Sequence, residues 1–149
     1  MARATDQDIP QAALVLGVAG LIPFVVLTAG VLTGRIFGAG PSLYALQIYA
    51  AVILSFMGGA QWGLAGGANS ESWLRYGASV LPAFVAWAGV WFSGAKGLWI
   101  MAAGFAGLLA YDLWTVRVGD TPAWYGRLRV ALTAGVVTCL IVTAALGPF

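Results

Sequence analysis

Long apolar stretches separated by short polar segments dominate this sequence. The apolar stretches run over residues 11–33, 43–66, 73–93, 97–116 and 128–146. Each is about as long as the roughly 20 residues that an α-helix needs to cross the hydrocarbon core of a bilayer. The segments between them contain the glycine, proline and charged residues that are typical of turns. The pattern predicts five transmembrane helices in one domain that covers residues 1–149.

The composition agrees with this pattern and argues against a soluble protein. Hydrophobic residues make up 61% of the chain and charged residues only 8%, whereas soluble domains carry about 25% charged residues. The formal net charge is +2, and the basic residues stand singly or in pairs at segment ends. We therefore expect membrane lipids, and not nucleic acid, as partners. The expected fold class is an all-α integral membrane protein, a bundle of five transmembrane helices.

Lysine and arginine are distributed unequally between the two ends of the predicted bundle. Five fall on the side where the chain begins and two on the other, namely Arg3, Arg75, Arg117, Arg127 and Arg129 against Arg35 and Lys96. Cytoplasmic connections of membrane proteins carry the excess of these residues. The count predicts a cytoplasmic N-terminus and a C-terminus on the opposite side. We expect a multi-pass protein of the bacterial inner (cytoplasmic) membrane whose first helix is retained in the mature chain.

The sequence offers little for catalysis or metal binding. It contains no histidine, which excludes histidine-ligated zinc and haem as well as serine–histidine–aspartate triads. Its one cysteine, Cys139, lies in an apolar run and is expected to pack as a small hydrophobic side chain. We therefore expect a protein that is not an enzyme, with no catalytic residue, no metal and no cofactor of its own.

Small residues form a stripe on the second predicted helix, in the segment SFMGGAQWGLAGG. Ser55, Gly59, Gly63 and Gly67 follow one another at intervals of four, which places them on one helix face. In a bilayer, close backbone approach at such faces drives helices together. The stripe predicts a helix-packing surface. A partner helix within this chain is the favoured interpretation, and a helix of another protein is the alternative.

Asp112 is the acidic residue placed most clearly inside a predicted helix. An ionisable group within a membrane is costly and requires a partner. We predict that Asp112 pairs with Arg75, with Gln61 as a further candidate member and with Trp62 and Tyr111 in the same layer. A structural ion pair is the favoured interpretation. A pocket for a quinone or a lipid headgroup and an Asp112 that faces water are the alternatives.

The segment DTPAWYGRLR has the features of a helix start. Asp120 or Thr121 is expected to cap the helix. Trp124, Arg127 and Arg129 are expected in the headgroup zone, where tryptophan anchors the helix and each arginine attracts anionic lipid by roughly 1 kcal/mol. Ordinary anchoring is favoured over a specific phospholipid site.

Several segments together resemble a known family. They are SFMGGAQWGLA (55–65), SVLPAFVAW (79–87), AYDL (110–113) and PAWYGRLRVALT (122–133). They are similar to the domain-of-unknown-function family that includes the mitochondrial transmembrane protein 69, and the resemblance extends from LGVAGLIPF in the first predicted helix over nearly the whole chain. It implies a five-helix inner-membrane protein of bacteria or mitochondria, and it implies no activity.

Three functions are consistent with these features. The favoured hypothesis is a non-catalytic accessory, structural or assembly subunit that packs by glycine-lined helices within a larger inner-membrane complex, respiratory or photosynthetic. The alternative is a small membrane protein or enzyme that binds a quinone or lipid in a pocket of Asp112, Arg75 and Gln61. A transporter is third, because few polar residues lie within the predicted helices.

Overall fold

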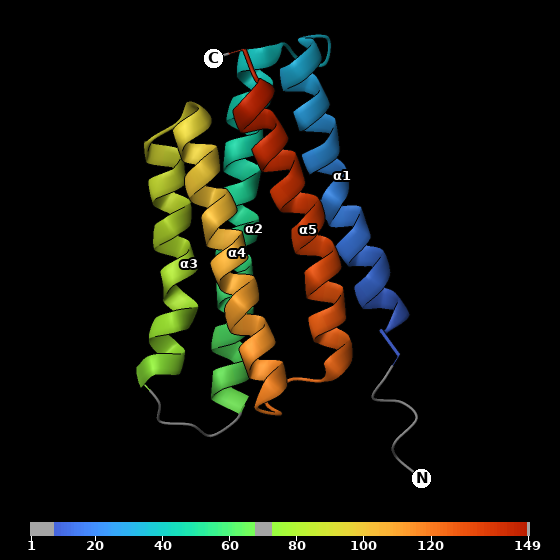
Figure 1. Ribbon diagram of the computed structural model, residues 1–149, viewed down its shortest axis with the longest axis vertical. Helices are drawn as coiled ribbons and strands as arrows, with labels where there is room; N and C mark the ends of the chain where they lie inside the picture. Colours follow the sequence, from blue (N-terminus) through green and yellow to red (C-terminus); the bar gives the residue numbers. More distant parts are fainter. Residues whose placement is uncertain (1–7, 68–72, 149) are drawn as a thin grey trace.

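The computed structural model describes residues 8–67 and 73–148, which fold into five α-helices (Figure 1). Their bounds are Gln11–Thr33 (α1), Ala39–Gly67 (α2), Trp73–Trp91 (α3), Gly94–Arg117 (α4) and Ala123–Leu146 (α5). The number of helices agrees with the sequence prediction. The largest differences are at the starts of α2 and α5, which begin four and five residues before the predicted positions 43 and 128.

The helices run up and down along one long axis, as Figure 1 shows. In the described part of the chain, α2 packs against α3 and α1, α4 packs against α5 and α3, and α1 closes against α5, with a smaller contact between α2 and α4. By length and composition, α1, α2, α4 and α5 can each cross a membrane. The chain is therefore a multi-pass helical membrane protein, and the crossing of α3 stays a prediction.

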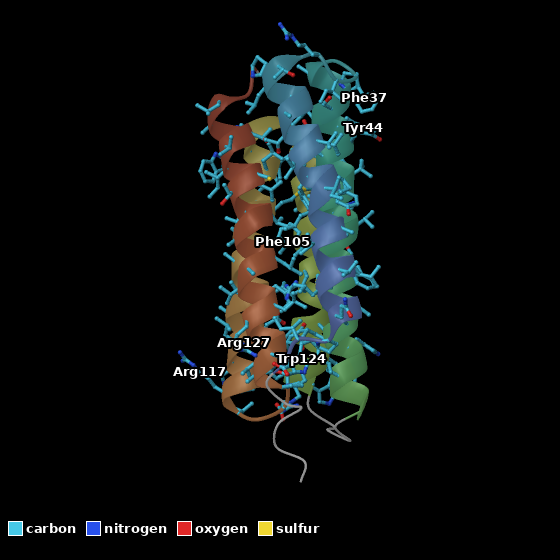
Figure 2. All side chains as sticks on the ribbon, turned by 90° about the vertical axis from the view of Figure 1, so that its right-hand side faces the viewer. Phe37, Tyr44, Phe105, Arg117, Trp124 and Arg127 are labelled. Carbon is cyan, nitrogen blue, oxygen red and sulfur yellow. The ribbon has the colours of Figure 1, made fainter. Side chains whose placement is uncertain are left out.

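The two ends of the bundle carry different side chains. Figure 2 shows Arg117, Trp124 and Arg127 at one end and Phe37 and Tyr44 at the other. The first end is also where α1 begins, whereas α5 ends at the opposite end (Figure 1). We call the end with Arg117 and Arg127 the basic end. Their position there agrees with the sequence prediction that these arginines share one side, and the sidedness of the bundle in the membrane stays a prediction.

Large apolar side chains fill the centre of the bundle. Phe24 and Phe105 meet edge to face, with ring centroids 6.3 Å apart, and both rings are buried. Other fully buried large apolar side chains among the described residues include Leu46, Leu54, Leu98, Met101 and Leu140. These residues come from α1, α2, α4 and α5, so they fix how those helices face one another. The polar residues described below lie between this core and the basic end.

Glycines allow the backbones to approach at specific points. A Cβ atom on Gly58 of α2 would lie 2.5 Å from the carbonyl oxygen of Ser79 and 3.2 Å from Cβ of Pro82 in α3. A Cβ atom on Gly97 of α4 would collide with the carbonyl oxygen of Gly89 in α3. Because no side chain separates these backbones, α3 fits closely against both α2 and α4.

Candidate functional site

A buried ion pair joins α4 to α5 near the basic end. Nε of Arg129 donates to Oδ2 of Asp112 over 2.5 Å, and the two side chains are 6% and 1% exposed. Asp112 lies five residues before Arg117, where α4 ends, and Arg129 lies six residues after Ala123, where α5 begins. Because the two helices form an antiparallel hairpin, these similar offsets place the two charges at the same depth.

Two further side chains complete this site. The Gln61 amide of α2 donates to Oδ1 of Asp112 and lies 3.5 Å from the hydroxyl of Tyr125. Nη1 of Arg129 also contacts the sulfur of Met57 over 2.7 Å. We call Gln61, Asp112, Tyr125 and Arg129 the polar cluster. It ties α2, α4 and α5 together by charge-assisted hydrogen bonds, which are stronger than neutral ones.

The predicted association of Gln61 with Asp112 is confirmed. The predicted pairing of Asp112 with Arg75 is wrong: Arg75 pairs instead with Asp120 over 2.5 Å, and both side chains are partly exposed. Arg75 lies in the first turn of α3, so its guanidinium reaches the connection between α4 and α5. Asp112 lies deeper, where Arg129 already contacts its carboxylate.

The position of Arg129 also differs from its predicted place in the headgroup zone. It is 5% exposed, because it belongs to the face of α5 that packs against the other helices. Buried residues recur along this face at intervals of four and three: Arg129, Thr133, Val136, Leu140 and Thr143. The sequence does not single out this face, because its members include an arginine and two threonines while the rest of the helix is at least as apolar.

The aromatic residues expected in the same layer lie around the polar cluster. Trp62 is half exposed and meets Tyr76 of α3 edge to face, with centroids 4.8 Å apart. Tyr111 is partly buried and lies next to a small cavity shared with Gln61 and Arg75. Neither Trp62 nor Tyr111 makes a hydrogen bond to Asp112 among the contacts of the described residues.

The start of α5 differs from the prediction in its cap. Pro122 occupies the N-cap position, and no side chain caps the helix. Thr121 instead shares a hydrogen bond of 3.1 Å with Thr115, and Asp120 pairs with Arg75. Trp124 and Arg127 lie at the basic end (Figure 2), where Arg127 is exposed. Their contact with lipid headgroups stays a prediction.

Two members of the small-residue stripe on α2, Gly59 and Gly63, face outward. Gly59 and Gly63 are exposed, and no heavy atom of a neighbouring described element lies within 4 Å of a Cβ atom built on either one. Ser55 is partly buried, and the surroundings of Gly67 lie outside the described residues. The favoured intramolecular interpretation is therefore wrong for Gly59 and Gly63, because Gly58 makes the close contact with α3. The intermolecular alternative stays a prediction.

Comparisons with known proteins place the chain in a family. The model of a family described as "Protein of unknown function (DUF3429)" matches residues 9–145. The chain belongs to this family. It is also similar to Transmembrane protein 69 of Xenopus tropicalis, with 38% identity over 143 residues. That match covers 91% of this chain and 54% of the relative, so the chain spans about half the length of that protein. No solved structure is significantly similar to the chain.

The match to the DUF3429 family covers every residue of the polar cluster. Chemically, the cluster is a charge-balanced arrangement: one carboxylate and one guanidinium share a layer with an amide and a phenol. Such a pair fixes the rotation of α4 and α5 about their axes, since turning either helix would leave a buried charge without its partner.

Proposed function

We propose that this protein is a non-catalytic accessory or assembly subunit of a larger complex in the bacterial inner membrane. In this proposal the outward face of α2 binds a helix of another subunit. Respiratory and photosynthetic complexes are the first in which to look for that partner. The proposal assigns no reaction, metal or redox cofactor to this chain.

The proposal rests on Gly59 and Gly63, where the backbone of α2 is exposed and no side chain of a described residue covers it. Both lie inside α2, and no neighbouring element of the described chain comes within 4 Å of the space that a Cβ atom would occupy. Glycine within a helix costs about 1 kcal/mol relative to alanine. Within the described chain, no close packing offsets that cost. A second helix packed against this face would offset the cost of the two glycines by van der Waals contact, as at other small-residue faces in membranes.

The surroundings of this face also support a protein partner. Phe56 and Trp62 lie beside it on α2 and are 66% and 51% exposed. On an exposed helix face, large aromatic side chains beside glycines leave an uneven apolar surface against which the side chains of a second helix can pack. The described connections are short, spanning residues 34–38, 92–93 and 118–122. They therefore offer little surface for partners outside the membrane, which favours contact through the helices.

Larger side chains on the small-residue stripe should separate the protein from its partner without unfolding it. We expect the double variant Gly59→Leu/Gly63→Leu to fold like the wild type in detergent and to lose the subunits that co-purify with the tagged wild-type chain. A Cβ atom meets no neighbouring described element at either position, and the leucine side chains keep a partner backbone away. Mild solubilisation, a native gel and mass spectrometry of the purified complex measure the effect.

Ala106→Leu is the matched control, because Ala106 is an exposed small residue on α4. We expect this variant to retain the partner. The proposal fails if the tagged wild-type chain migrates as a single small particle with no associated protein. It also fails if the double variant retains the same subunits as the wild type.

A further inference from the structure

A cavity of about 440 Å³ lies between α1, α2 and α5. Its wall is mostly apolar and includes Phe24 from α1, Phe56 from α2 and Leu132 from α5. Phe105 of α4 also lines it, and Figure 2 shows this residue at about half the height of the bundle. The volume lies within the range of roughly 300–1,000 Å³ that is usual for small-molecule sites.

Two polar residues line this cavity and have unused hydrogen-bonding atoms. Arg129 and Thr133 lie one helical turn apart on α5 and are 5% and 3% exposed. Nη2 of Arg129 and Oγ1 of Thr133 are buried and have no hydrogen-bond partner in the part of the chain that the structure describes. Buried polar atoms are nearly always hydrogen-bonded, so two of them beside one cavity require an explanation.

The charge around these atoms indicates which ligand fits. The Arg129 guanidinium is already balanced by the carboxylate of Asp112, 2.5 Å from its Nε. An anionic ligand would bring a second negative charge into the same buried layer, at a high desolvation cost. A neutral oxygen acceptor avoids that cost. It can accept one hydrogen bond from the guanidinium, which only donates, and one from the Thr133 hydroxyl.

We propose that this cavity binds an uncharged, lipid-soluble molecule through a carbonyl oxygen. The oxygen accepts hydrogen bonds from Nη2 of Arg129 and Oγ1 of Thr133, and the apolar body of the molecule lies along Phe24 and Leu132. Quinones and neutral ester lipids share this chemistry. The inference is separate from the proposed subunit role, because its site is a cavity between helices of this chain and it requires no protein partner.

Binding to the purified full chain tests the proposal. The protein is placed in nanodiscs of ether-linked lipid, which lacks ester carbonyls, and equilibrium binding is measured for three radiolabelled probes. They are a short-chain benzoquinone, a diacylglycerol and an alkylbenzene that has no carbonyl. We expect saturable binding of at least one carbonyl probe and none of the alkylbenzene. The probe that binds distinguishes a quinone from an ester lipid.

Two variants locate the site. Thr133→Val removes one donor while keeping the shape of the side chain, and we expect it to weaken binding about tenfold, as for the loss of one hydrogen bond. Gly20→Leu places a side chain in the cavity that Gly20 lines, where the nearest neighbouring atom to its Cβ position is the Tyr49 hydroxyl at 3.9 Å. We expect this variant to abolish binding.

Thr138→Val is the matched control, because Thr138 is an exposed threonine on the same helix. It should bind the probe like the wild type. Thermal unfolding of each variant shows that the fold is intact. The proposal is overturned if neither carbonyl probe binds saturably, or if the folded Thr133→Val or Gly20→Leu variant binds like the wild type.

Discussion

Replacing Asp112 with leucine lowers the free energy of unfolding by about 3–5 kcal/mol, the usual cost of removing one partner from a buried ion pair. The reason is that Arg129 is 5% exposed and its Nε donates to Asp112. Without the carboxylate, the guanidinium remains in the bundle as an uncompensated charge, and the Gln61 amide loses its acceptor as well. Equilibrium unfolding in mixed micelles, followed by circular dichroism, measures the loss.

Two further variants show that the charge, and not the altered shape, causes this loss. The double variant Asp112→Leu/Arg129→Leu should recover most of the stability, since apolar residues often replace a buried ion pair at little cost. Asp120→Leu breaks the partly exposed pair with Arg75 and should cost at most about 1 kcal/mol. An Asp112→Leu variant no less stable than Asp120→Leu would contradict the buried pair.

The second large effect is expected at Gly58, where α2 meets α3. Gly58→Ala places a methyl group 2.5 Å from the carbonyl oxygen of Ser79 and 3.2 Å from Cβ of Pro82. A carbonyl oxygen and a proline ring cannot rotate out of the way, so the two helices must move apart. Overpacking of this kind costs about 1–3 kcal/mol. Unfolding in the same mixed micelles measures the effect.

Gly59→Ala is the control for this prediction, because it adds the same methyl group one residue further along α2. No heavy atom of a neighbouring described element lies within 4 Å of that position, and alanine favours a helix over glycine by about 1 kcal/mol. Gly59→Ala should therefore leave the stability of the isolated chain unchanged or raise it slightly. If the two variants lose stability equally, the contact between α2 and α3 is not the one described.

The helices could be predicted from sequence because their signal is local. A transmembrane helix can be recognised from the length and composition of a charge-free stretch of about 20 residues. The predicted first helix matches α1 over Gln11–Thr33. The sequence indicates two positions for the start of α5. The apolar stretch begins at residue 128, whereas the segment DTPAWYGRLR has the features of a helix start near Asp120 or Thr121. The second is closer to the structure, because the helix begins directly after Pro122.

The polar cluster could be predicted only in part, because pairing depends on how each helix is rotated about its axis. The depth of Asp112 and of Gln61 follows from counting residues, and the contact between them agrees with the sequence prediction. The choice of the cationic partner does not follow from depth. Arg75 and Arg129 both lie near the basic end, and only the packing of α5 turns Arg129 inward while Arg75 reaches Asp120.

The glycine stripe shows the same limit. Spacing by four selects Gly59 and Gly63 as members of one face, which is correct, but it cannot say what that face contacts. In the structure, Gly58 is opposite Pro82 in α3, and Gly59 faces outward. The two residues are neighbours in sequence and differ by about 100° around the helix. The sequence alone contains no information about which direction leads to α3.

We predict that all five helices cross the membrane, so that the polar cluster lies inside it near the basic end. The most direct test is the position of the two termini, measured with a fluorescent reporter and a periplasmic phosphatase reporter fused in turn to each end. Five crossings predict that the two ends lie on opposite sides of the membrane, and the distribution of lysine and arginine predicts that the start of the chain is on the cytoplasmic side. Both ends on the same side would mean that α3, or another helix, does not cross, and would contradict the account.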